Sequence, residues 1–215
     1  MKILLVILSV VIVLFLGSQI YLYQGSHKIE GYKYEVITAY PGFEIRKYEA
    51  SLFTSIELDT DDYKQASSKG FSALGGYIFG KNEDKEQISM TSPVAMSLEA
   101  ETTMMFLVPK KYTIDNLPKP QNSNIEFIEM PERMIAAVTF GGWASNEKIA
   151  LYRLALEEML KKNAIKHTGR FSVLGYNPPY EFLFRRNEII VELETISEWD
   201  FSWTFLSMKW KFAGY

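Results

Sequence analysis

The chain has 215 residues and a formal net charge of −3, with an isoelectric point near 5.6. This length suits a single domain with appended segments and is ample for a hydrophobic core. The slight acidic excess argues against nucleic acid as the main partner, because phosphate binding requires a basic face. The absence of cysteine excludes disulfide bonds and thiolate ligands, and His27 and His167 are the only imidazoles.

Residues 1–23 are the most apolar part of the chain and are predicted to form a transmembrane anchor. Lys2 before this segment is weak positive-inside evidence for a single-pass membrane protein whose soluble domain is extracytoplasmic. The alternative is a cleaved signal peptide, which would leave a secreted or periplasmic domain. Gly17-Ser18-Gln19 would be a poor cleavage site, since it lacks the usual small-x-small pattern.

A polar segment over residues 24–33 is interpreted as a linker, and strands are predicted over 34–37, 43–48 and 51–58. A helix is expected to open after Thr60 or Asp61, either of which is a good N-cap. Its glycines lower helix propensity, and they have two competing explanations. They permit close packing against strands, or they leave a shallow surface for a flat ligand. These glycines are Gly70, Gly75, Gly76 and Gly80.

Further strand-like runs follow at ISMTSPVAMSLE, MMFLVPK, IEFIEMPE and MIAAVTFGG, with a polar, proline-containing connector over residues 115–124. A second helix is predicted from Ser145 to about Asn163, with an apolar stripe typical of core packing. The turn GYNPPYEFLF and the strand NEIIVEL complete this part.

The order of elements in the second half repeats that of the first half. Matched landmarks are Tyr34 with Ile125, Asp62 with Asn146, Pro93 with Pro178, and Phe106 with Ile189. A duplicated β-β-α-β-β unit that cannot close its own sheet needs its twin to bury the apolar face. The repeat therefore predicts one α+β domain with a cleft between two pseudo-equivalent halves.

Several motifs resemble the SOUL haem-binding-protein family: FEIRKYE, MTSPV, PVAM, FGGW and above all GYNPPYEFLFRRNEIIVEL. The resemblance runs from about Tyr34 to Leu193, and the domain is assigned to residues 34–196. It implies a distorted β-barrel flanked by two helices. It also implies binding of haem or a related tetrapyrrole, without turnover, in a shallow apolar groove.

A haem site needs an apolar slot and cations for two propionates. In the family frame, the slot would come from Phe71, Leu74 and Ile78 with the loop at Pro178 and Pro179. The cations would be Lys64, Lys69, Arg185 and Arg186, of which arginine suits paired contacts to a carboxylate. An ordinary solvated surface position is the alternative for each of these charged residues.

The sequence departs from the family pattern at the axial ligand. Some members have a histidine after the isoleucine-arginine pair of FEIRKYE, and Lys47 occupies that position here. A protonated lysine cannot ligate iron, so iron coordination is in doubt. The possible substitutes, His167, Tyr48, Tyr77 and Met90, each have a simpler structural interpretation.

Two other functions remain open at this stage. The same fold could bind another flat amphiphile, or it could be a hydrolase in which Glu181 acts as a base on water. No triad or zinc motif supports the enzyme hypothesis. The aromatic C-terminal tail, residues 197–215, alternates in a strand-like pattern and is expected either to add an edge strand or to rest on the membrane.

Overall fold

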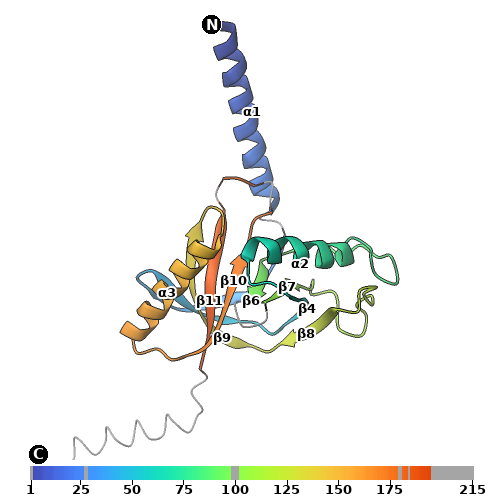
Figure 1. The fold of residues 1–215 in the computed structure, drawn as a ribbon, viewed down its shortest axis with the longest axis vertical. Helices are drawn as coiled ribbons and strands as arrows, with labels where there is room; N and C mark the ends of the chain where they lie inside the picture. The colour runs from blue at the N-terminus through green and yellow to red at the C-terminus, as the bar shows by residue number, and fades with distance from the viewer. Residues whose placement is uncertain (1, 27–28, 98–101, 179–180, 184, 195–215) are drawn as a thin grey trace, which may run out of the picture.

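The computed structural model describes residues 2–26, 29–97, 102–178, 181–183 and 185–194. Helix α1 (Lys2–Ser26) projects from one end of a mixed α and β domain (Figure 1). Among the described residues, α1 is the one helix long and apolar enough to cross a membrane. The predicted tail over 197–215, together with His27 and Pro179, lies outside the described residues.

Nine strands form one antiparallel sheet, in the order β2-β3-β9-β11-β10-β6-β7-β4-β8. The strands are β2 (Tyr34–Tyr40), β3 (Phe43–Tyr48), β4 (Ser51–Leu58), β6 (Val94–Ser97), β7 (Thr102–Leu107), β8 (Ile125–Met130), β9 (Arg133–Gly141), β10 (His167–Gly175) and β11 (Arg186–Leu193). Helices α2 (Tyr63–Ile78) and α3 (Asn146–Lys162) pack on one face of this sheet (Figure 1).

The two repeats exchange their first strands. Each repeat supplies strand, strand, helix, strand, strand, as β3-β4-α2-β6-β7 and as β8-β9-α3-β10-β11. Strand β3 pairs with β9 of the second repeat, and β8 pairs with β4 of the first. The structural counterpart of β8 is therefore β3, which begins at Phe43, and not the strand at Tyr34 expected from sequence.

The α+β class is confirmed, whereas the expected barrel is not seen to close. Strands β2 and β8 are the two edges of the sheet, and no ladder among the described residues joins them. The sequence pattern predicts strands but does not reveal which of them lie at the edges of the sheet.

The segment assigned to a linker is partly packed against the domain. Strand β1 (Glu30–Gly31) forms a short parallel pair with β5 (Thr91–Ser92). The Tyr32 amide donates to the Ser92 carbonyl at 3.0 Å, and the Tyr32 side chain is buried. The packed domain thus begins before Tyr34.

The helices begin where side chains can cap them. Asp62 is the N-cap of α2 and accepts from the Gln65 amide, one residue later than expected from sequence. Ser145, where the second helix was expected to start, is the N-cap of α3 and accepts from the Lys148 amide. These caps satisfy amide groups that an uncapped first turn leaves without partners.

Three clusters of buried side chains stabilise the domain. One lies between α2 and the first half of the sheet, and another lies between α3 and the second half. The third lies on the opposite face of the sheet, around Tyr48, Phe53 and Ile190. Both faces of the sheet are therefore apolar at its centre.

Gly70 marks the closest approach of α2 to the sheet. A Cβ atom at this position would lie 2.7 Å from the Met104 sulfur, 2.9 Å from the Met104 Cβ and 3.1 Å from a Leu58 methyl. At Gly75, a Cβ atom would meet the Phe71 ring at 3.5 Å and the Phe79 ring at 3.9 Å, both ordinary contacts. Close packing, one of the two explanations offered for the glycines, accounts for Gly70.

We expect Gly70→Ala to lower the thermal midpoint, because overpacking against a Cβ atom costs about 1–3 kcal/mol. Gly75→Ala is the matched control and should be neutral or stabilising by up to about 1 kcal/mol through helix propensity. Thermal unfolding followed by circular dichroism measures both. Equal midpoints for the two variants would contradict the close approach at Gly70.

Candidate functional site

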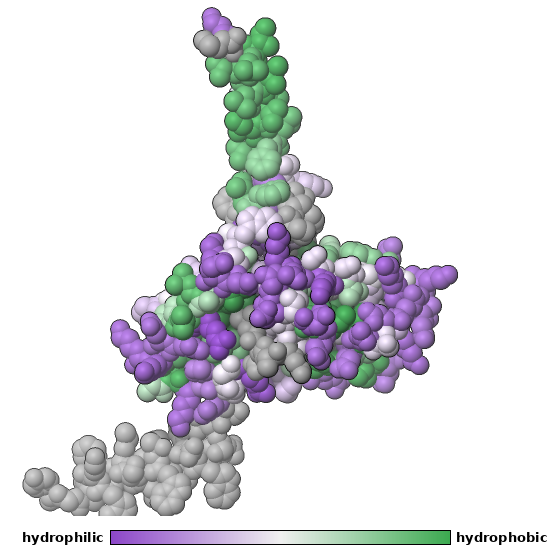
Figure 2. All heavy atoms as spheres, in the orientation of Figure 1, coloured by the Kyte–Doolittle hydropathy of each residue, from purple (hydrophilic) through white to green (hydrophobic). Residues whose placement is uncertain are grey.

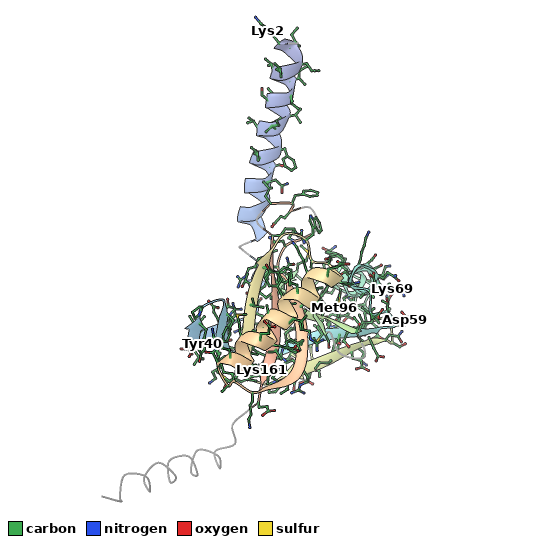
Figure 3. The ribbon with its side chains drawn as sticks, turned by 60° about the vertical axis from the view of Figure 1, so that its left-hand side comes forward. Lys2, Tyr40, Asp59, Lys69, Met96 and Lys161 are labelled. Atoms are coloured by element: carbon green, nitrogen blue, oxygen red, sulfur yellow. The ribbon has the colours of Figure 1, made fainter. Side chains whose placement is uncertain are left out.

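A groove of about 850 Å³ lies where the two repeats meet. Its floor is the pair β6–β10, which contributes Val94 and Met96 from one repeat and Val173 and Gly175 from the other. Met96 lies inside the domain, between the helices and the sheet (Figure 3). Because each repeat supplies half of the floor, the groove exists only in the duplicated domain.

The amino ends of α2 and α3 meet along one side of the groove. The Asn146 side-chain amide donates to the Asp62 carboxylate at 3.0 Å, and the Tyr63 amide donates to the Asn146 side-chain oxygen at 2.9 Å. Asp62 also accepts from the Gln65 amide. The protein's own side chains thus satisfy these helix ends, and the contact fixes the two repeats relative to each other.

Small and aromatic side chains shape the walls. On α2, the serines Ser67, Ser68 and Ser72 face the groove and leave room beside Phe71. Across the groove stands the indole of Trp143, 51% exposed at the rim, whereas the ring of the lining residue Tyr176 packs against the cluster on the opposite face of the sheet. A flat apolar ligand could contact rings on both sides and the aliphatic floor below.

Arg185 lines the groove, yet the backbone occupies most of its guanidinium. Its Nη1 donates to the carbonyls of Pro178 and Glu181, at 2.9 and 2.7 Å, and its Nη2 donates to the Asn177 carbonyl at 3.2 Å. Its Cζ lies 3.9 Å from the centre of the Trp143 ring. Arg185 therefore holds the β10–β11 loop in place and has few donors left for a carboxylate.

The two lysines of α2 have different surroundings. Lys64 lines the groove and makes no ion pair among the described residues. Lys69 is paired with Asp59 at 2.9 Å, and both lie at the outer edge of the domain (Figure 3). Of these lysines, the structure brings only Lys64 to the groove.

The other residues considered from sequence fall into two groups. Phe71 and Pro178 line the groove, whereas Leu74 and Ile78 are buried between α2 and the sheet. Arg186 is half-buried on the opposite face, where its Nη2 pairs with Glu188 at 2.6 Å. Phe71 is 40% exposed whereas Leu74 is fully buried, a distinction that helical spacing alone did not reveal.

Among the residues that the structure describes, no imidazole lines the groove. Lys47 is exposed on β3, where it pairs with Glu132 at 2.8 Å, and it is not a lining residue. His167 is half-buried at the start of β10, where its Nδ1 accepts from the Gly169 amide. Among the described residues, no three histidine, aspartate or glutamate side chains gather as metal ligands.

The remaining candidates for an iron ligand are poor ones. Burial raises the pKa of the Tyr63 hydroxyl, and burial together with Glu188 raises the pKa of Tyr176, so both stay protonated at neutral pH. The lining methionines, Met90, Met96 and Met104, offer only neutral thioethers. The described lining therefore fits a macrocycle, and none of its side chains is an imidazole or thiolate donor for iron.

Glu181, considered as a hydrolytic base, is buried and lies outside the groove lining. One of its oxygens accepts from the Asn177 side-chain amide at 2.6 Å, and the other has no partner among the described residues. Its exposed fraction is 1%, which leaves little access for a substrate or water. The contacts of Glu181 stay within the β10–β11 loop.

A buried charged cluster lies beneath the groove, and the sequence did not point to it. Arg46 of β3 reaches across β9 to β11 and donates to both oxygens of Glu188, at 2.8 and 3.1 Å. The Tyr176 hydroxyl, which belongs to a groove-lining residue, donates to Glu188 at 2.7 Å, and Thr139 donates to it at 3.1 Å. The cluster thus connects the exchanged strand β3 to the groove wall.

The charge state of Glu188 follows from these partners. Burial alone would raise its pKa, but the hydrogen bonds and charge of Arg46, with the charge of Arg186, lower the pKa below the ordinary value. Glu188 is therefore ionised at neutral pH. A paired carboxylate of this kind contributes to stability as long as it remains ionised.

Trp143, Tyr176 and the α2 serines line the groove but were not predicted to do so from the sequence. The FGGW and GYNPP motifs contain Trp143 and Tyr176, but motifs give no direction for a side chain. The serines at positions 67, 68 and 72 follow helical spacing on one face, a pattern that could have indicated a polar wall with free space beside it.

The chain matches a family model described as SOUL heme-binding protein over residues 29–192. It is 29% identical to Heme-binding protein 2 of Mus musculus over 72% of this chain and 80% of the relative. It is 27% identical to Heme-binding protein 1 of Xenopus laevis over 68% of this chain and 81% of the relative. The fold is similar to that of the EcmrR C-terminal domain, with a TM-score of 0.56 and 12% identity over 76% of this chain and 99% of that domain.

We expect Glu188→Gln to destabilise the domain by about 3 kcal/mol at neutral pH, because it leaves Arg46 buried without its main partner. The greater stability of the wild type should decrease as the pH falls below about 4.3, the usual pKa of a glutamate, and should be lost as the pH passes the lower pKa of Glu188 in the folded state. Denaturant unfolding between pH 7 and pH 3 measures the difference.

Glu132→Gln removes the exposed partner of Lys47 and is the control, for which no resolvable change is expected. A constant stability gap between wild type and Glu188→Gln across this pH range would contradict the role assigned to the Glu188 charge.

Proposed function

This chain belongs to the SOUL heme-binding protein family, and we propose that it binds haem or a related tetrapyrrole in the groove between its repeats. The proposed role is carriage or buffering of the ligand without turnover, by a domain tethered to a membrane through α1. The observation that carries the proposal is a groove of about 850 Å³, with an apolar floor and aromatic walls, in a member of this family.

The size and chemistry of the groove support a ligand of this class. Pockets of about 300–1,000 Å³ accommodate drug-sized ligands, and burial of apolar area contributes most of their binding free energy. Val94, Met96 and Val173 supply an aliphatic floor, and Lys64 at the rim supplies a cation for a propionate. Asp62 and Glu147 also line the groove, which disfavours a highly anionic ligand.

Bound haem would supply an iron centre open to axial ligands, and the residues lining this groove offer it no imidazole or thiolate. We infer that binding depends on burial of the ring and on the carboxylates, and that the metal contributes little. The protonated Tyr63, which lines the groove, would orient the ligand by contact with its face or edge. This interpretation extends to other flat amphiphiles that present the same apolar area.

We expect hemin, zinc protoporphyrin and metal-free protoporphyrin to bind at one equivalent with affinities within about tenfold, which corresponds to 1.4 kcal/mol. Absorbance and fluorescence titrations of the full-length protein in detergent measure the three affinities. A large preference for hemin would contradict the absence of iron ligation. No saturable binding of any porphyrin would favour another amphiphile in the same groove.

Ser68→Trp locates the site, because a bulky ring on the groove face of α2 should abolish porphyrin binding. Gln65→Trp is the matched control, since Gln65 is exposed on the same helix and does not line the groove. Equal affinities of the two variants would place the ligand elsewhere.

Lys64→Ala should weaken porphyrin binding by roughly two- to fivefold, the range expected from an exposed ion pair. Lys69→Ala should leave the affinity unchanged, because Lys69 pairs with Asp59 away from the groove. Raised salt should reduce the wild-type affinity toward that of Lys64→Ala. The same loss in both variants would indicate a general charge effect and contradict a direct contact with Lys64.

The membrane tether rests on α1. Its window Lys2–Gln19 has a mean hydropathy of 2.4, and only 6% of it is buried against the domain. Figure 2 shows the continuous apolar surface of α1 standing clear of a largely hydrophilic domain surface. A hydrocarbon core is the environment that would cover such a surface. We place the domain on the extracytoplasmic side, with a cleaved signal peptide as the alternative.

A further inference from the structure

The base of α1 contacts the loop that forms one wall of the groove. The Phe182 amide donates to the Gln19 side-chain oxygen at 2.9 Å, and Gln19 is buried. The centre of the Phe182 ring lies 6.4 Å from the centre of the Phe15 ring and 6.1 Å from the centre of the Trp143 ring. A continuous set of contacts therefore leads from α1 through Phe182 to Trp143 at the groove rim.

The position of Phe182 relative to α1 fixes its depth in a bilayer that α1 spans. The apolar window Lys2–Gln19 has 18 residues. At 1.5 Å per residue it is about 27 Å long, close to the roughly 30 Å of a hydrocarbon core. Gln19 then lies at the membrane surface, and Phe15 lies about 6 Å inside it. Phe182 contacts Gln19 through its amide and lies beside Phe15 through its ring, so Phe182 must lie close to the lipid.

The side chains around this contact suit a membrane interface. Phe182, Leu183 and Trp143 are 54%, 37% and 51% exposed, although all three are large and apolar. Aromatic rings are favoured at the boundary between hydrocarbon and headgroups. The guanidinium of Arg185 stacks on the Trp143 ring and donates to the carbonyls of Asn177, Pro178 and Glu181, so it holds this rim against the β10–β11 loop.

We propose that the rim formed by Trp143, Phe182 and Leu183 rests in the lipid interface and that the groove exchanges its ligand directly with the bilayer. The ligand class is then an amphiphile that partitions into the membrane leaflet, with its apolar part in the lipid and its acidic groups at the surface. This inference rests on the proposed membrane tether and deepens the proposed binding function. The bilayer acts both as the partner surface and as the source of the ligand.

The natural lack of cysteine allows a single label to test the contact. Phe182→Cys in the full-length protein is coupled to an environment-sensitive fluorophore and reconstituted into phosphatidylcholine vesicles. Phe79→Cys is the matched control: Phe79 is also an exposed phenylalanine, 56% exposed, but it lies at the carboxyl end of α2. We expect the emission of the fluorophore at position 182 to shift to the blue and to be quenched by nitroxide-bearing lipids. We expect neither effect for the fluorophore at position 79.

The outcomes separate this inference from the proposed function. Leu183→Cys repeats the measurement in case the label at position 182 disturbs the Gln19 contact. A water-like signal at both rim positions, or equal quenching at position 79, would overturn the membrane-facing rim while leaving porphyrin binding in detergent intact. Release of the protein by alkaline carbonate would overturn the tether itself. Rim quenching without porphyrin binding would overturn only the assignment of the ligand.

Uptake from lipid tests the route of exchange. Vesicles loaded with protoporphyrin are mixed with proteoliposomes, and the rise of bound porphyrin is followed by fluorescence. We expect the double variant Phe182→Asp, Leu183→Asp to slow uptake while keeping its affinity in detergent, and Phe79→Asp to match the wild type. An unchanged rate would overturn uptake through the rim. An equal loss of affinity in detergent would mean that the two side chains act on the ligand, which also overturns the proposal.

Discussion

The exchange of first strands between the two repeats is the constraint on which the rest of the structure depends. Strand β3 belongs to the first repeat in sequence but lies beside β9 of the second, and β8 makes the reciprocal move to β4. Arg46 of β3 then crosses β9 to reach Glu188 of β11, both fully buried. Neither repeat can complete its part of the sheet without the other, so folding and assembly of the two halves are one event.

The groove is a direct consequence of this arrangement. Antiparallel pairing of β6 with β10 brings one strand from each repeat to the centre of the sheet, and the contact of Asp62 with Asn146 brings the two helix ends together above it. The space between them has walls from both repeats and an apolar floor. Glu188 ties the Tyr176 wall to Arg46, and it thereby couples the shape of the groove to the stability of the exchanged strand.

Local patterns in the sequence predicted most elements but not their relative placement. The structure contains the strands predicted over 43–48 and 51–58 and the helix predicted to start near Ser145. These predictions succeed because alternation and helix starts are short-range properties of the sequence. The repeat was visible, yet the exchange of β3 and β8 was not, since strand pairing is long-range. For the same reason Leu74 and Lys69 were grouped with Phe71, although one faces the sheet and the other the solvent. The Arg46–Glu188 pair is separated by 142 residues and had no local signal.

The lack of an axial ligand among the described lining residues and the contact of the groove rim with α1 are consistent with one physical requirement. A site that binds a macrocycle through apolar area alone gains about 25 cal/mol per Å² relative to water, but the interior of a bilayer offers the same ligand a comparable gain. Such a site cannot extract its ligand from lipid irreversibly, whereas a strong metal–ligand bond could. Lys47, paired with Glu132 outside the groove, provides no such bond. A groove of this kind would equilibrate with a membrane beside it, which is the behaviour that the proposed buffering or carriage requires.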